Sequence, residues 1–351
     1  MNDLNIYGWN EKLNYLKQST QYKSLPHGRV SIVHRTCYEV ISEKGTFQCE
    51  LTGNMLFARS DLELPCTGDW VIFQPVDQNK GIIVDMLPCE RTLRRKKIGT
   101  ISGRQTIASH VNKAFIVQSL DENFNVRRVE RFLYQILEEE IVPVLVLNKA
   151  DLDFDRRAID ASIKHIAYRT PIFYTSIHLP NTINQLREYI EEGETVVFVG
   201  SSGVGKSSLI NALCEKAVLL ASDISLATGK GRHTSTRREM VLLDGSGVLI
   251  DTPGVREFGL VTDNPNSLSE MLTVADYSQS CRFDDCRHEN EPDCAVIEAV
   301  QKGRLEQKVY DSYLKLRREA WYFSTSEHEK RKRAKSFSKL GDEIKKRKKN
   351  R

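Results

Sequence analysis

The sequence predicts a multidomain protein with a small N-terminal β-barrel of the OB type, a central α/β domain and a mainly helical C-terminal domain. Three observations predict this architecture: five short β-rich segments come first, strands then alternate with helices, and three cysteines gather with a histidine before a last helical stretch. At 351 residues the chain exceeds the usual size of a single hydrophobic core, so several domains are expected.

The composition is that of a soluble globular protein, with 40% hydrophobic and 28% charged residues. No apolar run approaches the ~20 residues that span a bilayer, and the N-terminus lacks the basic and apolar segments of a secretory signal. Five of the eight cysteines are scattered and three lie with a histidine, which favours reduced thiols and one metal site over a disulfide framework. We therefore expect a cytoplasmic protein without a membrane partner.

Basic residues are concentrated at the C-terminal end. Between Lys330 and Arg351, twelve basic residues outnumber two acids, a net charge of +10, so the +4 of the whole chain leaves −6 for the rest. Such a tail, 330–351, is suited to a polyanion such as RNA, because basic side chains at phosphates release counterions. A solvated tail that only aids solubility is the alternative.

Residues 1–27 form an N-terminal extension, expected to be partly helical at Glu11–Gln18. A barrel is expected over residues 28–90 and a basic linker over 91–108. Five short strands in about sixty residues favour an OB-type barrel, although another small β-domain has the same pattern. Turn residues separate the five strands: Arg29–Val33, Cys37–Ile41, Thr46–Leu51, Gly68–Phe73 and Gly81–Met86.

Strand–helix alternation over residues 109–260 predicts a parallel sheet flanked by helices. Three sequence motifs each follow an apolar, β-branched run, namely Ile141–Leu147, Thr195–Val199 and Val248–Ile250. The motifs therefore lie at the carboxyl ends of strands, where open α/β sheets bind their ligands.

The second of these motifs, Gly-x-x-x-x-Gly-Lys-Ser, is a phosphate-binding loop. Its glycines let backbone N–H groups surround the phosphates, Lys206 is expected to reach the terminal phosphates, and Ser207 offers a hydroxyl to Mg²⁺. The helix that follows adds partial positive charge at its N-terminus. The predicted phosphate-binding residues are Gly200, Ser201, Ser202, Gly203, Val204, Gly205, Lys206, Ser207 and Ser208.

The first motif, Asn148-Lys149-Ala150-Asp151, predicts selection of guanine. The Asp151 carboxylate accepts two hydrogen bonds from guanine, whereas adenine lacks that donor pair and would leave the carboxylate unpaired. Asn148 is expected at the acceptor edge of the base and Lys149 along its ring. Ser176, after the next strand, is expected to close over the base, with an ordinary loop residue as the alternative.

The third motif, Asp251-Thr252-Pro253-Gly254, predicts a second Mg²⁺-binding segment. Asp251 is expected in the shell of the ion and Gly254 at the γ-phosphate. A polar segment before it contains Thr234 and Thr236, both candidates for a hydroxyl ligand of Mg²⁺.

The expected hydrolysis is slow, because Val255 occupies the position where a small GTPase usually has a water-positioning glutamine. His233 is the candidate catalytic residue within the chain, and contact with a partner only is its alternative. In an ordinary small GTPase the phosphate loop precedes the Asn-Lys-x-Asp motif, whereas here it follows. The order predicts a circularly permuted P-loop GTPase that binds GTP and GDP with Mg²⁺.

Near the C-terminus, three cysteines and one histidine lie within fourteen residues, a set suited to tetrahedral Zn²⁺. The residues between them are mostly polar, so zinc would supply folding energy that a hydrophobic core does not. Four protein ligands leave no open position, so we expect one structural Zn²⁺, with unliganded reduced cysteines as the alternative. This zinc-binding domain is expected over residues 261–329, with a helix from about Val300 to Phe323. The expected ligands are Cys281, Cys286, His288 and Cys294.

Together, the barrel with Gly68-Asp69-Trp70-Val71, the permuted motif order, the run from Asp251 to Leu260 and the Cys/His cluster closely resemble the RsgA family of circularly permuted GTPases. The resemblance covers nearly the whole chain. It implies an OB-fold, a GTPase and a zinc domain, and a role late in small-ribosomal-subunit maturation. It also implies slow hydrolysis until the subunit stimulates it, and help in releasing an assembly factor. The N-terminal extension and the basic tail are less typical.

The partners implied are the small ribosomal subunit with its rRNA and ribosome assembly factors, and we expect a monomer because no coiled-coil heptads are present. One alternative is a permuted GTPase that acts on the large ribosomal subunit, against which the order of the flanking domains argues. The other is an RNA-binding scaffold that nucleotide only stabilises.

Overall fold

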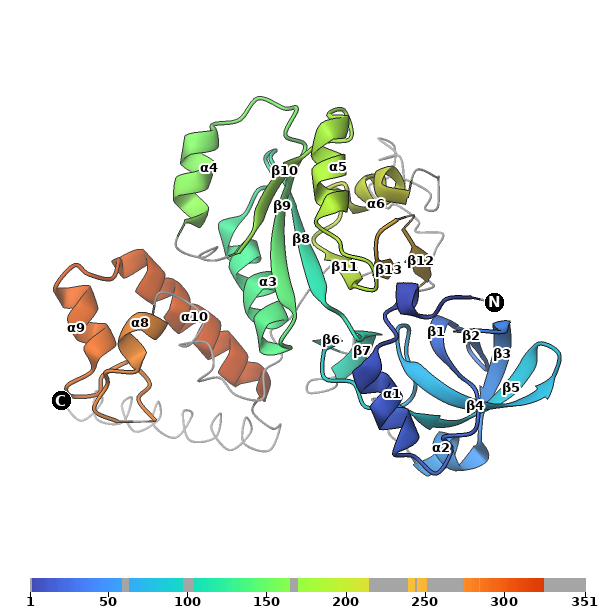
Figure 1. The fold of residues 1–351 in the computed structure, drawn as a ribbon. Helices are drawn as coiled ribbons and strands as arrows, with labels where there is room; N and C mark the ends of the chain where they lie inside the picture. Colours follow the sequence, from blue (N-terminus) through green and yellow to red (C-terminus); the bar gives the residue numbers. More distant parts are fainter. Residues whose placement is uncertain are drawn as a thin grey trace, which may run out of the picture. The chain divides into compact units, whose positions relative to one another are not determined.

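Figure 1 shows a computed structural model that describes residues 2–58, 63–96, 104–164, 170–214, 239–243, 245–250, 274–283 and 285–324. The chain divides into two units. One comprises Met1–Arg95 and Gln105–Phe258, and the other comprises Lys96–Arg104 and Gly259–Arg351. No helix among the described residues is long and apolar enough to cross a membrane.

The first unit begins with a closed five-stranded barrel in the order β1-β2-β3-β5-β4, which confirms the predicted OB-type topology. β1 pairs antiparallel with both β2 and β4, and β3 pairs parallel with β5. Apolar side chains from successive strands fill the interior, among them Val30, Val40 and Phe73. The elements are β1 (His27–Val33), β2 (Tyr38–Ser42), β3 (Gly45–Leu51), α2 (Gly53–Ala58), β4 (Trp70–Asp77) and β5 (Lys80–Met86).

The N-terminal extension packs onto the barrel through η1 (Asn5–Tyr7) and α1 (Glu11–Gln18). The Asn10 side chain caps α1 by accepting a hydrogen bond from the backbone N–H of Leu13 at 3.0 Å, which explains why the helix begins where the sequence predicts. Leu13 is buried against Trp70 of the barrel. After β5, the chain forms a two-stranded sheet of β6 (Thr92–Lys96) and β7 (Arg104–Ser109), which extends one residue beyond the predicted linker.

A six-stranded sheet follows in the order β10-β9-β8-β11-β13-β12. All neighbouring strands are parallel except the edge strand β12, which is antiparallel to β13. The strands are β8 (Lys113–Ser119), β9 (Val142–Asn148), β10 (Ile172–Thr175), β11 (Thr195–Val199), β12 (Met240–Leu242) and β13 (Val248–Ile250).

Helices cover both faces of this sheet (Figure 1). α3 (Val126–Glu138) and α4 (Arg156–Ile163) contribute to the core on one face, and α5 (Pro180–Glu188) and α6 (Lys206–Cys214) to the core on the other. Successive side chains of a strand point to opposite faces. In β8, for example, Ile116 belongs to the first core and Phe115 to the second.

The described part of the second unit is mainly helical, with α8 (Ala275–Ser278), α9 (Ala295–Gln301) and α10 (Gln307–Ser324). The predicted start of the last helix, at about Val300, is wrong. α9 ends at Gln301, and α10 begins six residues later, at Gln307. Gly303 has a φ of 67°, a left-handed conformation that ends helices and that glycine adopts without a steric cost.

Candidate nucleotide and metal sites

The strand order brings the base-reading motif and the phosphate loop to the same edge of the sheet. β9 ends at Asn148, β11 ends at Val199, and β8 lies between these two parallel strands. Carboxyl ends of parallel strands share one edge, so both loops emerge side by side.

Asn148 links the two loops directly. It is 4% exposed, and its side-chain amide donates a hydrogen bond to the Val204 carbonyl at 2.8 Å. Its side-chain oxygen accepts a hydrogen bond from the Thr175 hydroxyl at 3.2 Å. The contact of Asn148 with the base stays a prediction, and the structure adds a second role, because the amide also fixes the phosphate loop.

The phosphate loop leads into α6, which begins at Lys206. The Lys206 ammonium donates hydrogen bonds to the carbonyls of Gly200 at 2.8 Å and Ser201 at 2.6 Å, so it lies over its own loop. Gly205 has a φ of 93°, and a Cβ there would lie 2.3 Å from the Asn148 side-chain nitrogen. Any other residue at this position would therefore be strained and would collide with the base-reading motif.

Asp151 and Ser176 come together at the opposite end of the base-reading motif. The Ser176 hydroxyl donates a hydrogen bond to the Asp151 carboxylate and accepts one from the backbone N–H of His178 at 3.0 Å. The Ser176 bond lowers the pKa of Asp151. The backbone N–H of Ala150 donates a hydrogen bond to the Thr175 carbonyl at 3.0 Å, which holds the motif against the end of β10. An ionised, exposed Asp151 is the group that guanine recognition requires.

Asp121, a residue that the sequence pattern did not single out, holds Lys149. The Lys149 ammonium lies 2.7 Å from the Asp121 carboxylate, which also accepts hydrogen bonds from the Ser119 hydroxyl and the Asn123 backbone. Burial raises the pKa of Asp121, but these hydrogen bonds outweigh it and lower the pKa to about 2. The only signal in the sequence was an acid two residues beyond the buried strand β8.

Arg128 is a second functional candidate that sequence reasoning missed. It lies in the first turn of α3, and its guanidinium donates a hydrogen bond to the Ser201 hydroxyl of the phosphate loop at 2.9 Å. The two residues are 73 positions apart, so no local pattern pointed to the contact.

The remaining predicted site residues fall into three sets. Ser202 and Gly203 are exposed at the tip of the phosphate loop, whereas Ser207 and Ser208 lie in the first turn of α6. The others lie outside the described residues: His233, Thr234, Thr236, Asp251 and Gly254.

The four expected zinc ligands converge in the second unit. Their ligand atoms all lie within 4.8 Å of one another. The Cys281 sulfur lies 3.9 Å from the Cys294 sulfur and 3.5 Å from Nδ1 of His288, and that nitrogen is 3.4 Å from the Cys294 sulfur. A zinc tetrahedron with Zn–S bonds of about 2.3 Å has S–S edges of about 3.8 Å, so the donor set fits the ion.

The loop that carries these donors is fixed from outside the cluster. His288 is 3% exposed, and its backbone carbonyl accepts a hydrogen bond from the Tyr310 hydroxyl at 2.6 Å. Arg317 donates to the carbonyl of Arg287, the preceding residue. Two side chains of α10 therefore hold the metal-binding loop.

The comparisons with known proteins agree with this geometry. A model of the RsgA GTPase family matches residues 86–261. The chain is 68% identical, over 99% of its length and 98% of the relative, to small ribosomal subunit biogenesis GTPase RsgA 1 of Bacteroides thetaiotaomicron. It is 36% identical to the RsgA of Leptospira interrogans serovar copenhageni, over 89% of this chain and 87% of that one.

Two solved structures have similar folds. YjeQ from Thermotoga maritima matches with a TM-score of 0.61 and 26% identity, over 84% of this chain and 98% of that one. YloQ, described as a circularly permuted GTPase, shares the fold with a TM-score of 0.62 at 24% identity, over 86% of this chain and 96% of that one. The permuted order of β9 and the phosphate loop, the closed barrel and these matches lead to one conclusion: the chain belongs to the RsgA family of circularly permuted GTPases, enzymes that hydrolyse GTP.

Proposed function

We propose that this GTPase assists late maturation of the small ribosomal subunit. The observation that carries the proposal is the 68% identity, over almost the entire chain, to a relative named for biogenesis of that subunit. The OB-type barrel offers a surface of a kind that often binds nucleic acid, and the +10 tail supplies charge for rRNA phosphates. Assistance in releasing an assembly factor, a monomeric state and a cytoplasmic location belong to the same proposal.

The nucleotide site of the proposal is built on two loops. Asp151 selects guanine, Lys149 packs along the base, and residues 200–208 bind the phosphates. The hydrogen bond from Asn148 to the Val204 carbonyl, which joins the two loops, supports the assignment. Ser207 and Asp251, with Thr234 or Thr236, are the residues that would hold Mg²⁺, and the ion would supply positive charge against the phosphate charge.

We assign catalysis to His233 and a structural Zn²⁺ to Cys281, Cys286, His288 and Cys294. Val255 has no group that orients water, so a residue of the preceding switch segment is the candidate within the chain. Tetrahedral spacing of the described donor atoms supports the zinc assignment. When bound, zinc supplies folding energy to a loop whose residues are mostly polar.

The domain boundaries of the proposal follow the sequence: an extension at 1–27, a barrel at 28–90, a linker at 91–108, the GTPase at 109–260, the zinc domain at 261–329 and the tail at 330–351. Strand β7 ends at Ser109, the first residue of the proposed GTPase domain, and β8 begins at Lys113. A truncated protein that begins near residue 91 would test whether the GTPase folds without the barrel.

The deciding experiment measures GTP hydrolysis by the purified protein alone, with small subunits and with large subunits. We expect strong stimulation by the small subunit only. Stimulation by the large subunit alone would redirect the proposal to that subunit, and equal rates in all three reactions would exclude the ribosome as activator. His233→Ala, tested next with small subunits, should abolish the stimulation while GDP binding is unchanged.

A further inference from the structure

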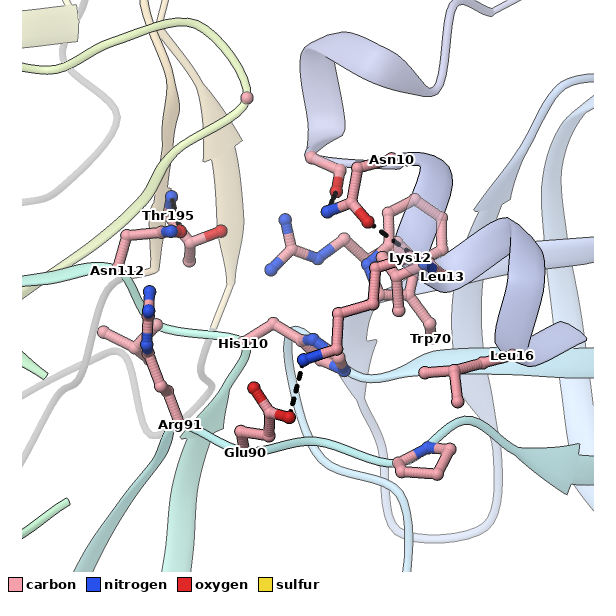
Figure 2. Close-up of a pocket in the computed structure, with 15 residues that line it drawn as sticks. Asn10, Lys12, Leu13, Leu16, Trp70, Glu90, Arg91, His110, Asn112 and Thr195 are labelled. Carbon is pink, nitrogen blue, oxygen red and sulfur yellow. Dashed lines mark hydrogen bonds and ion pairs between the residues drawn. The ribbon is translucent and has the colours of Figure 1, made fainter. Parts of the chain in front are cut away.

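Figure 2 shows a cavity of about 320 Å³ at the starts of β8 and β11, strand ends opposite to those that carry the nucleotide loops. It is bounded by α1, by the barrel, and by the residues that precede β8 and β11. Those two strands enter the sheet here and end at Ser119 and Val199, beside the nucleotide site. The lining residues that matter for its chemistry are Lys12, Arg29, Trp70, Glu90, Arg91 and His110.

Arg29 gives the cavity its unusual character. Its side chain is 1% exposed, Nε donates to the Gly68 carbonyl at 2.9 Å, and Nη1 donates to the Tyr7 carbonyl. Nη2 is buried and has no hydrogen-bond partner. Within the part of the chain that the structure describes, no carboxylate forms an ion pair with this guanidinium. A buried charge that no carboxylate contacts is costly, so an anionic partner would stabilise the fold here.

Asp69, which interacts electrostatically with Arg29, forms no ion pair with it. Asp69 is 4% exposed, and its carboxylate accepts a hydrogen bond from the Cys66 backbone at 2.7 Å, which closes the turn before β4. Asp69, Cys89 and His110 also place donor atoms within 4.8 Å of one another, a spacing that a metal ion could use. The guanidinium of Arg29, which interacts with Asp69 and Cys89, already supplies positive charge there and disfavours a metal cation.

The rest of the wall is also suited to an anion. Nε2 of His110 is buried and lacks a partner, and Arg91 lines the cavity with an exposed side chain. The Lys12 ammonium of α1 lies 2.6 Å from the Glu90 carboxylate, so the one carboxylate among the lining residues is paired with a cation (Figure 2). Burial and the charge of Arg29 lower the pKa of His110 to about 3, so the ring is neutral and carries one N–H.

We propose that this cavity is a binding site for a small oxyanion of the phosphate type, in which Arg29 Nη2 and Nε2–H of His110 donate hydrogen bonds and Arg91 closes the outer side. Arginine provides charge-assisted hydrogen bonds that match the tetrahedral oxygens of phosphate. The site is separate from the nucleotide loops, because it lies at the starts of β8 and β11, whereas those loops lie at the opposite edge of the sheet, at the ends of β9 and β11.

The test titrates the full chain with inorganic phosphate and follows tryptophan fluorescence. Trp70 lines the cavity, and the Trp9 ring contacts the Trp70 ring with centroids 4.9 Å apart. The fluorescence of both residues therefore responds to binding in the cavity. Trp321→Phe removes the third tryptophan, which lies in α10. Saturating GDP and Mg²⁺ keep phosphate out of the nucleotide loop, and sodium chloride at equal ionic strength corrects for screening.

We expect a saturable signal that Arg91→Ala and Arg29→Lys weaken at least about tenfold, as expected for lost charged hydrogen bonds. Arg157→Ala, which removes an exposed arginine of α4, should leave the signal unchanged. Because Arg91 is exposed, its variant remains informative even where Arg29→Lys destabilises the fold. No saturation up to about 50 mM phosphate, or equal affinity in the Arg91 and Arg157 variants, would overturn the proposal.

A second arm identifies the source of the anion. A 5′-phosphorylated RNA dinucleotide is titrated beside free phosphate under the same conditions. Tighter binding of the dinucleotide would identify an RNA phosphate as the natural occupant, and tighter binding of free phosphate would identify a soluble ion.

Discussion

The side-chain amide of Asn148 donates a hydrogen bond to the carbonyl of Val204 across 2.8 Å and so ties the base-reading motif to the phosphate loop. The two residues are 56 positions apart: Asn148 is the last residue of β9, and Val204 follows β11. Asn148 and Val204 are both buried, so water does not replace the bond when it is lost. The base and phosphate halves of the site are therefore positioned as one body.

Asn148→Ala should weaken GTP and GDP binding alike. Loss of a buried hydrogen bond that leaves its partner unpaired costs about 1–3 kcal/mol, or about ten- to a hundredfold in affinity. Calorimetric titration with GDP measures the loss. Thr175→Val is the matched control, because it removes only the hydroxyl that bonds the other side of the same amide at 3.2 Å, and it should cost less. An unchanged GDP affinity in Asn148→Ala would contradict the coupling.

Gly205→Ala should abolish nucleotide binding, whereas Gly203→Ala should only reduce it. Both glycines have positive φ, 93° and 81°, so both variants carry backbone strain. Only the Cβ at position 205 would collide with the Asn148 side chain, since nothing lies within 4 Å of the corresponding position at residue 203. Fluorescent GDP binding compares the two. Equal losses would show that strain, and not the collision with Asn148, decides the effect.

Asp121→Asn should lower stability in a pH-dependent way. The folded pKa of Asp121 is about 2 against an ordinary 3.8, so the carboxylate stabilises the folded state above the ordinary value. This contribution to the free energy of unfolding falls as pH decreases from 3.8 to about 2, and it is lost below the folded pKa. Denaturant unfolding at several pH values should show the native protein more stable than the variant at neutral pH, with the gap closing toward pH 2. A gap that is independent of pH would contradict the assignment.

Asp151→Asn should weaken GTP binding and shift preference toward xanthosine nucleotides. The amide presents a donor where the carboxylate accepted hydrogen bonds from guanine, and xanthine offers an acceptor in that place. Competition between GTP and xanthosine triphosphate measures the preference. Ser176→Ala, which removes the hydroxyl bonded to Asp151, serves as the comparison and should retain guanine selectivity with lower affinity.

Removal of zinc should unfold the second unit selectively. The purified protein should contain about one zinc per chain, and a strong chelator or Cys286→Ser should remove both the metal and the thermal transition of that unit. Cys37→Ser, at an isolated cysteine of the first unit, is the control and should keep the metal. Identical thermal unfolding curves with and without chelator would contradict the assignment of a structural zinc.

Local signals explain which features the sequence predicted well. Asn10 caps α1 through its own side chain, so the helix starts where it was expected, and buried runs before polar motifs located the loops of the site. Long-range contacts left no such signal. Arg128 meets Ser201 only because α3 and the phosphate loop converge in the fold. Gly303 was a local signal that the predicted helix overlooked: its positive φ ends α9, and the backbone N–H groups of Gly303 and Arg304 bond the carbonyls of Val300 and Ala299.

The order of strands also constrains the moment during synthesis at which each part of the protein can form. All five barrel strands precede residue 87, so the barrel has its complete set of partners before any strand of the large sheet emerges. β8 and β9 are the first strands of the large sheet to be synthesised. The other neighbour of β8, β11, follows about fifty residues after β9. Synthesis proceeds at roughly 5–20 residues per second. A nascent chain therefore carries a finished barrel and an open sheet edge for several seconds, and edges of this kind are where mispairing begins.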